Sequence, residues 1–368
     1  MLIPSAAERF STSKFTPATA ESPYHRCYFY VGGQYRADEN GNGEHVFTDQ
    51  MYVEQLTPIG GAKHAWPLVF IQGAGQSGTN FLNTPDGRKG WATWLLDHGY
   101  TICLLDQTSR GRSSYHHSNG PTTTYSAELA EKCWTACRDL GEWPEAALHT
   151  QWPGSGRMGD PIFNAFYAST VPSLKDYAAE ETLMQAAGAS LLDRIGPAIL
   201  ITHSQGGTHG WLWADARPEL VRAIVAIEPS GPPFQSVLVK GSLIVKPYGI
   251  TNVPLSYDPP TDNAIDDKTP LKTQEHPAAD GRRIILQQEP ARKLVNLSKI
   301  PVLLETGEAS YHAAYDEFTV IFLRQAGVNV MHLKLADEGI HGNGHMQFLE
   351  LNNLDIIELL EKWIATVL

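Results

Sequence analysis

Short apolar runs alternate with amphipathic segments along most of the chain. Runs of aliphatic and β-branched residues, bounded by Gly, Pro or Asp, predict buried strands. Such runs occupy residues 67–71, 100–105, 198–201, 220–227, 301–305 and 328–335, whereas residues 24–35 and 46–56 alternate between apolar and polar side chains, as do the two strands of a hairpin. Apolar positions every three or four residues predict helices. They occur over residues 91–98, 176–192, 208–216, 316–325 and 355–368. This alternation predicts an α/β fold, a mostly parallel sheet with helices on both faces.

Three segments fall outside this alternation. Residues 1–22 are rich in Ser, Thr and Ala and read as an N-terminal arm with little structure of its own. Residues 114–175 carry many aromatic side chains between prolines and glycines, and residues 231–297 are rich in Pro, Asp and Thr. Each of the two is either a cap over a pocket or a packed peripheral insertion. Because no repeat or linker interrupts the chain, we expect a single domain over residues 1–368.

Composition narrows the classes of partner. The chain has 368 residues, a net charge of −12 and no basic stretch, which argues against nucleic acid and anionic membrane as partners. No apolar run approaches the roughly 18 residues of a transmembrane helix. Four cysteines do not make a disulfide framework, and free thiols are typical of a reducing compartment. The first residues lack the pattern of a signal peptide. We therefore expect a cytoplasmic protein.

The most informative stretch for chemistry is Ile199–Gly207. An apolar strand ends in His-Ser-Gln-Gly-Gly, and a helical pattern follows at once, so that Ser204 lies at a sharp turn. The nucleophile elbow of α/β-hydrolases, G-x-S-x-G, has this layout. Thr202 occupies the first glycine position of that pattern. The alternative is an ordinary strand-to-helix turn in which Ser204 caps the helix.

A nucleophilic serine needs a base, an acid that orients the base, and donors for the oxyanion. In this fold the acid and then the histidine follow the serine along the chain. His345 is the preferred base and His341 its alternative, since both follow the last predicted strand. Two glutamates compete as the acid. Glu228 follows the strand 220–227 and Glu308 follows the strand 301–305. The spacing leaves both open.

Backbone N–H groups are the expected oxyanion donors. A Gly-rich loop, residues 72–78, follows a buried strand, where α/β-hydrolases carry their oxyanion loop. The candidates are the amides of Ala74 in this loop and of Gln205 after the serine. Asp106 and Arg110 read as a structural clamp between strand ends. The chemistry needs no metal and no organic cofactor.

Seven strings carry a more specific signal than the elbow alone: Gln72–Thr79, Thr84–Trp91, Leu105–Ser113, Thr202–Gly206, Ile227–Pro229, Gly342–Met346 and Asn352–Asn353. Together they resemble one branch of the α/β-hydrolases, the bacterial esterase 713 type. The resemblance implies Ser204 as nucleophile, His345 as base and the amides of Ala74 and Gln205 as the oxyanion hole. It also implies Glu228 rather than Glu308 as the acid. Some fungal lactonases that act on zearalenone have a glutamate there too, which keeps lactones among the substrates.

These observations predict a serine hydrolase that cleaves a small-molecule carboxylic ester, or a lactone, through an acyl-enzyme. Bond type rests on the family resemblance, because an amidase would use the same groups. The alternative is a non-hydrolytic relative, such as a biosynthetic cyclase, a lyase or an acyltransferase, or a ligand-binding protein with the same pocket. Strands and closing helices of this fold can pair subunits, so a homodimer stays open.

Overall fold

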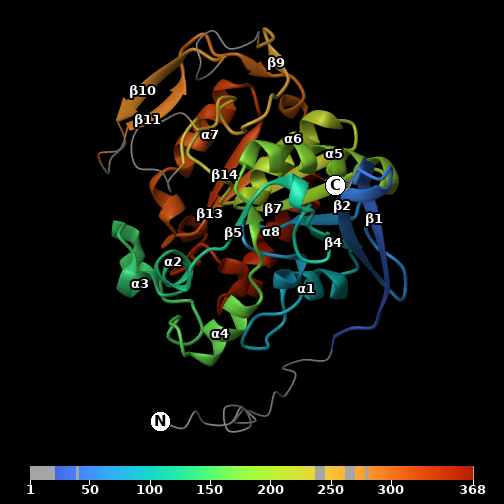
Figure 1. The fold of residues 1–368 in the computed structure, drawn as a ribbon. Helices are drawn as coiled ribbons and strands as arrows, with labels where there is room; N and C mark the ends of the chain where they lie inside the picture. Colours follow the sequence, from blue (N-terminus) through green and yellow to red (C-terminus); the bar gives the residue numbers. More distant parts are fainter. Residues whose placement is uncertain are drawn as a thin grey trace, which may run out of the picture.

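An eight-stranded sheet forms the centre of the computed structural model, in the order β1-β2-β4-β3-β7-β8-β13-β14 (Figure 1). The structure describes residues 21–38, 41–236, 245–261, 270–277, 281 and 283–367. The strands are β1 (Tyr24–Ala37), β2 (His45–Pro58), β3 (Leu68–Ile71), β4 (Ile102–Asp106), β7 (Ala198–His203), β8 (Val221–Ile227), β13 (Val302–Thr306) and β14 (Val330–Lys334). β2 runs antiparallel to β1 and β4, and every other pairing in the sheet is parallel. The mostly parallel sheet expected from the sequence is confirmed.

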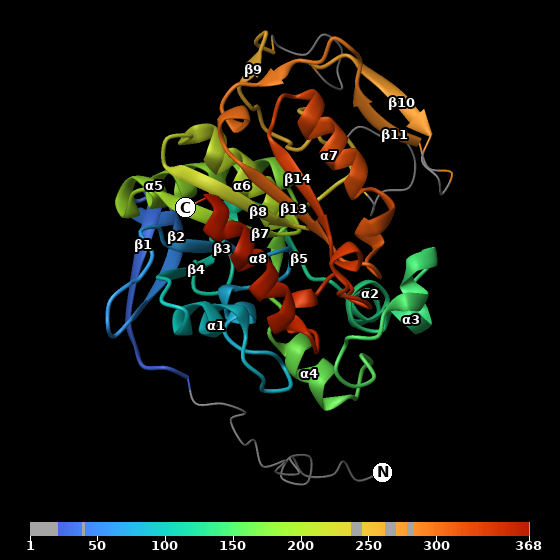
Figure 2. The same ribbon diagram turned by 180° about the vertical axis from the view of Figure 1, so that it is seen from behind.

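Helices cover both faces of the sheet. α5 (Tyr177–Ile195) and α6 (Gln205–Ala216) lie in front in Figure 1, whereas α8 (Asn353–Val367) comes forward in Figure 2, seen from behind. α7 (Asp316–Gln325) packs into the core of the first face, and α1 (Trp91–Asp97) into that of the second. No helix in the described part of the chain is long and apolar enough to cross a membrane.

Alternation along the strands creates two separate cores. Val69 and Ile71 of β3 pack with α5, α6 and α7, whereas Leu68 and Phe70 of the same strand pack with α1 and α8. Successive side chains of a strand point to opposite faces, so a continuous apolar run feeds both cores. This explains why the strands of the parallel part of the sheet appear in the sequence as unbroken hydrophobic runs.

The irregular segments carry short elements of their own. Residues 114–175 include α2 (Ala127–Ala130), α3 (Cys137–Leu140), α4 (Pro161–Ala168) and the paired strands β5 (Thr122–Thr123) and β6 (Ser173–Leu174). Residues 231–297 include β9 (Tyr257–Asp258), β10 (Thr273–Pro277), β11 (Arg283–Gln287) and β12 (Lys293–Leu294). Of these, β10 and β11 lie near α7 in both views (Figures 1 and 2). Residues 1–20 of the predicted arm lie outside the described residues.

Most aromatic side chains of residues 114–175 build a packed layer. Trp134 and Trp152 both meet Phe166 edge to face, with ring centroids 6.3 and 5.4 Å apart, and all three are buried. They join the core that contains α1 and α8. Tyr125, by contrast, lines the pocket described below. The segment therefore packs into the core and also contributes a side chain to the pocket.

The string Thr84–Trp91 holds the start of α8. The Arg88 guanidinium donates to the carbonyls of residues 349–351 at 2.9–3.1 Å and to Oδ1 of Asn353 at 3.0 Å. Nε1 of Trp91 donates to the Asn353 carbonyl at 2.7 Å. These bonds tie the end of the loop after β14 to the start of α1, although the two segments are about 260 residues apart in the sequence.

We predict that Gly188→Ala destabilises the fold even though Gly188 lies within α5. A Cβ atom there would lie 1.9 Å from Cε2 of the buried Trp213 on α6. Alanine gains roughly 1 kcal/mol in helix propensity. Overpacking outweighs that gain, so we expect a net loss of about 1–3 kcal/mol in the free energy of unfolding.

Urea unfolding of this variant beside Gly60→Ala measures the effect. No heavy atom lies within 4 Å of a Cβ at Gly60, so that substitution should change stability by less than about 0.5 kcal/mol. Equal urea midpoints for both variants would contradict the prediction, because they would show that α5 and α6 accommodate the added methyl group without loss of stability.

Candidate active site

Ser204 lies at the turn between β7 and α6 with φ 53° and ψ −120°. A non-glycine residue in this region is strained and needs support from its surroundings. The Ser204 N–H donates to the Ile227 carbonyl at 3.1 Å, and the Ser204 carbonyl accepts from the N–H of Ser230 at 2.9 Å. A Cβ at Gly206 would lie 2.1 Å from the Ile71 carbonyl oxygen, so only glycine fits there. The turn therefore exposes Ser204 at the carboxyl ends of the parallel strands.

Thr202 occupies a position where the elbow pattern has glycine, and a glycine on the facing helix accommodates it. A Cβ at Gly210 of α6 would lie 2.7 Å from Cγ2 of Thr202. The space that glycine usually provides on the strand is thus provided on the helix. The departure from the pattern leaves the strand and helix closely packed.

Glu228 and His345 meet beside the turn. Nδ1 of His345, in the loop after β14, donates to Oε2 of Glu228, at the end of β8, at 2.5 Å. The carboxylate also accepts from the Gly307 N–H at 2.8 Å and from the Ser310 hydroxyl at 2.7 Å. Both side chains are buried, and burial raises the pKa of Glu228 and lowers that of His345. The donors around Glu228 oppose the effect of burial by stabilising its ionised form.

The two alternative candidates pair with each other instead. Oε1 of Glu308 lies 3.1 Å from Nδ1 of His341, whose side chain is 62% exposed. The other carboxylate oxygen of Glu308 accepts from the Gly342 N–H at 2.9 Å. The residues that the sequence left in competition thus form two separate pairs, one buried next to Ser204 and one at the surface.

A second buried carboxylate holds the loop that carries His345. Glu350 accepts from the Gly344 N–H at 3.0 Å and from Nδ2 of Asn343 at 2.8 Å. Nε2 of His149, from residues 114–175, lies 2.8 Å from the same carboxylate. The loop of His345 is therefore held by Glu350, which follows it in the sequence, and by His149, which belongs to residues 114–175.

His203, beside the serine, also supports this loop. Its Nε2 donates to the His345 carbonyl at 2.9 Å. Burial lowers the pKa of His203 to about 3, so it stays neutral near neutral pH. His203 thus holds the loop of His345 from the position directly before Ser204.

Sequence reasoning missed His312, which lines the pocket and stacks on His345 with ring centroids 4.7 Å apart and planes 6° apart. Its Nδ1 donates to Oδ1 of Asp316 at 3.0 Å, and burial lowers the pKa of His312 to about 4. A neutral His312 ring places no positive charge beside His345. The spacing of His312 and Asp316, four residues apart at the start of a predicted helix, was the available signal.

Donor atoms of Glu228, His312 and His345 lie within 4.8 Å of one another, close enough to hold a metal ion. In the arrangement described here, Glu228 and His345 bond to each other and His312 bonds to Asp316. The three side chains are thus already hydrogen-bonded within the chain.

Ala74 and Gln205 both border the pocket next to Ser204. The loop that carries Ala74 is tied to residues 171–173. The Gly75 N–H donates to the Ser173 hydroxyl at 3.1 Å, and the Gly75 carbonyl accepts from the N–H of Val171 at 2.8 Å. Among the described residues, neither the Ala74 N–H nor the Gln205 N–H donates to another group of the chain. Both amides are free to meet a ligand.

The predicted clamp between Asp106 and Arg110 is wrong. Asp106 pairs with Arg112 at 2.8 Å and accepts from the Gly78 N–H at 3.0 Å. Arg110 turns inward under the elbow because Glu180 of α5 provides a buried carboxylate 2.5 Å away. Arg110 also donates to the Gly73 carbonyl at 3.1 Å and to Oε1 of Gln205 at 2.7 Å. Spacing in the sequence does not distinguish two arginines in one turn.

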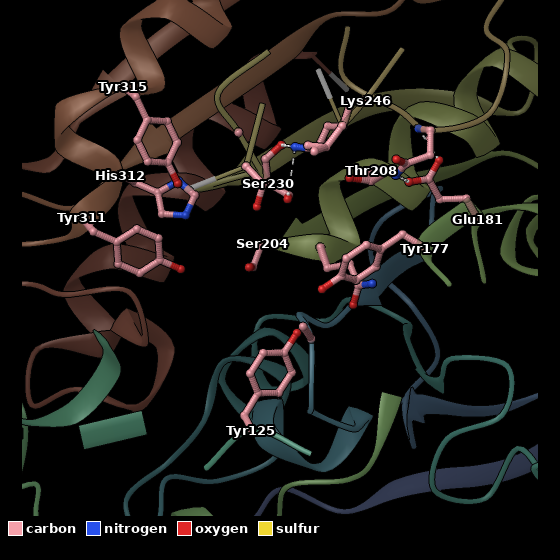
Figure 3. A pocket seen from close by; sticks show the side chains of 16 residues that line it. Tyr125, Tyr177, Glu181, Ser204, Thr208, Ser230, Lys246, Tyr311, His312 and Tyr315 are labelled. Atoms are coloured by element: carbon pink, nitrogen blue, oxygen red, sulfur yellow. Dashed lines mark hydrogen bonds between the residues drawn. The ribbon is translucent and has the colours of Figure 1, made fainter. Parts of the chain in front are cut away.

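A pocket of about 240 Å³ opens over Ser204. Aromatic hydroxyl groups surround it, from Tyr125, Tyr177, Tyr311 and Tyr315 (Figure 3). Two charged side chains, Glu181 and Lys246, complete its wall on one side (Figure 3). Neither was singled out from the sequence, because isolated charges in loops and helices carry no motif.

Known proteins are similar to the chain over most of its length, although no protein-family model matches it. A bacterial esterase of known structure superposes with a TM-score of 0.60 at 22% identity, covering 95% of this chain and 98% of that one. A protein named probable secreted lipase phiG, from Fungal sp. (strain ATCC 74256), is 47% identical over 342 residues, which are 92% of this chain and 88% of the relative.

The fungal relative corrects the expected location. It is named a secreted protein, which contradicts the expectation of a cytoplasmic one. That expectation rested partly on the cysteines, and Cys27, Cys103, Cys133 and Cys137 are indeed free thiols. A chain of this size, however, buries a sufficient core without disulfides, so free thiols do not indicate the compartment.

The fold provides the first part of an identification, since the sheet and its helices match those of a bacterial esterase. The 47% identity to the fungal lipase provides the second. By this identity the chain belongs to the family of that lipase, and it shares the fold of the bacterial esterase.

Proposed function

We propose that the chain hydrolyses carboxylic esters with Ser204 as nucleophile, His345 as general base and Glu228 as the acid that orients the base. The observation that carries this assignment is the buried 2.5 Å contact between His345 and Glu228 next to the strained turn of Ser204. Esterase and lipase are also the names of the two similar proteins, which favours hydrolysis over lyase or transfer chemistry.

The proposed reaction has two halves. The Ser204 hydroxyl attacks the ester carbonyl while Nε2 of His345 takes its proton, and the alcohol leaves with that proton. Water then attacks the acyl-enzyme, and His345 again transfers the proton, releasing the acid and restoring Ser204. Glu228 keeps the Nδ1–H of His345 oriented in both halves. A lactone, which is an internal ester, would open by the same steps.

Ala74 and Gln205 are the proposed oxyanion donors. The Gln205 N–H lies in the first turn of α6, where no intrahelical acceptor exists and the helix dipole favours negative charge. The Ala74 N–H belongs to the same peptide unit as the Gly73 carbonyl, which accepts from Arg110. That bond holds the plane of the peptide and polarises its N–H. Arg110 is thus a positioning residue that acts through the Gly73–Ala74 peptide.

We further propose that the chain works as a single α/β-hydrolase domain, with residues 114–175 and 231–297 contributing its cap. Tyr125 from the first segment and Lys246 from the second both line the pocket over Ser204. Secretion is proposed as well, by analogy with the fungal relative.

We predict that Ser204→Ala lowers kcat roughly 10⁶-fold and Glu228→Gln roughly 10⁴-fold on a p-nitrophenyl ester. The first change removes the nucleophile, and the second leaves His345 without its anionic partner. Glu308→Gln is the matched control and should keep near wild-type activity, because Glu308 pairs with the exposed His341. A fluorophosphonate probe should label wild type and not Ser204→Ala.

A normal rate for Glu228→Gln together with a strong loss for Glu308→Gln would transfer the acid's role to Glu308. If wild type turns over no ester and takes up no fluorophosphonate, nucleophilic hydrolysis itself is refuted.

We predict that Arg110→Lys lowers kcat about 10- to 100-fold with little change in KM, since a single ammonium cannot bond Gly73, Gln205 and Glu180 in the same geometry. Affinity for a trifluoromethyl ketone, which mimics the tetrahedral state, should fall in parallel. The control is Arg112→Lys, because Arg112 binds Asp106 and Glu54 away from the pocket. A loss in KM alone, with unchanged affinity for the ketone, would contradict the positioning role.

A further inference from the structure

Lys246 is a buried cation in the wall of the pocket that contains Ser204. The residue is 6% exposed. Its ammonium donates to the carbonyl of Ser230 at 2.8 Å and to the hydroxyl of the same residue at 3.3 Å (Figure 3). Within the described parts of the chain, no carboxylate forms an ion pair with it. An ammonium has three N–H donors, so one remains beyond the two that Ser230 receives.

A buried ammonium without a counter-ion is unfavourable, because burial removes its hydration and no anion compensates. Burial accordingly lowers the pKa of Lys246 to about 8, although the more distant carboxylates of Glu181 and Asp316 oppose the shift. At neutral pH the side chain is therefore still mostly protonated. An anion entering the pocket would supply the missing partner.

The two nearest carboxylates are already bonded to other groups. Glu181 accepts from the backbone N–H groups of Asn252 and Val253 at 2.7 and 3.1 Å. Asp316 accepts from His312 at 3.0 Å and from a threonine hydroxyl at the same distance. These hydrogen bonds hold both carboxylates in their present positions. Lys246 is left as the cation available to a ligand.

One residue connects Lys246 to the reacting serine. Ser230 gives its N–H to the Ser204 carbonyl at 2.9 Å and receives the ammonium of Lys246 through its own carbonyl and hydroxyl. Figure 3 shows Lys246, Ser230 and Ser204 bordering the same space, with tyrosines opposite. A small molecule whose carbonyl meets Ser204 can therefore bring a second group to Lys246.

We propose that Lys246 binds a carboxylate of the substrate, so that the enzyme selects esters carrying a carboxylate a few bonds from the scissile carbonyl, such as hemiesters of short dicarboxylic acids. This proposal rests on the proposed ester hydrolysis at Ser204. The carboxylate can belong to the acyl part or to the alcohol part of the ester. In either case it takes the third N–H of the ammonium and forms the ion pair that the protein lacks.

The test compares anionic esters with neutral esters of the same shape. On the acyl side, monoethyl glutarate is paired with ethyl 5-methylhexanoate, and on the alcohol side 4-acetoxybutyrate with 4-methylpentyl acetate. We expect wild type to favour the anionic member of at least one pair in kcat/KM. Lys246→Met should lower the anionic-to-neutral ratio about 10- to 100-fold, the range typical of a hydrogen bond to a charged group. Lys246→Arg should retain most of the ratio, and the exposed Lys299→Met should leave it unchanged.

Binding of glutarate, measured by calorimetry on the Ser204→Ala protein with and without Lys246→Met, needs no turnover. Glutarate binding that depends on Lys246, in a wild type that hydrolyses no ester, would support the anion site and refute the proposed reaction. Hydrolysis that favours the neutral esters, with no glutarate binding, would overturn the anion site and keep the reaction. If Lys246→Met does not fold, the wild-type preference and glutarate binding to Ser204→Ala decide the question.

Discussion

The hydrogen bond between Glu228 and His345 is the contact on which the site depends. It joins the end of β8 to the loop after β14, two segments separated by more than one hundred residues. Parallel strands bring their carboxyl ends to one edge of the sheet, and β8 and β14 flank β13 there. Much of what surrounds this edge serves to hold the two side chains in register. Glu350 and His203 anchor the loop of His345, and Arg88 anchors the chain that follows it.

Buried charge is the second organising feature. Arg110 donates to Glu180, to Gln205 and to the carbonyl of the proposed oxyanion peptide. That arrangement makes the loop stiff where a developing negative charge would need fixed donors. Lys246 is the contrasting case, since Ser230 takes only two of its three donors and no carboxylate pairs with it among the described residues. One cation is thus committed to structure, and the other is left for a ligand.

The fold was largely predictable. Continuous apolar runs such as Leu68–Ile71 and Ala198–His203 identified the buried parallel strands, because a strand covered on both faces has no polar alternation. The helix predicted over residues 316–325 agrees with α7 at both ends. The elbow at Ser204 and the location of His345 also followed from local patterns. The expected cytoplasmic location is contradicted by the fungal relative, which is named a secreted protein, since free cysteines do not report the compartment in a chain with a large core.

The sequence by itself determined the strands, the helices, the α/β fold class and the short set of residues able to do nucleophilic chemistry, because each leaves a local pattern of spacing or composition. Only the tertiary structure decided which of these residues meet. It paired Glu228 with His345 and Glu308 with His341, turned Arg110 inward while Arg112 took Asp106, and brought His312 and Lys246 to the pocket. Such pairings depend on the order of strands in the sheet and on the direction of each side chain at a turn. Neither the order of the strands nor the direction of these side chains follows from the spacing of residues along one chain.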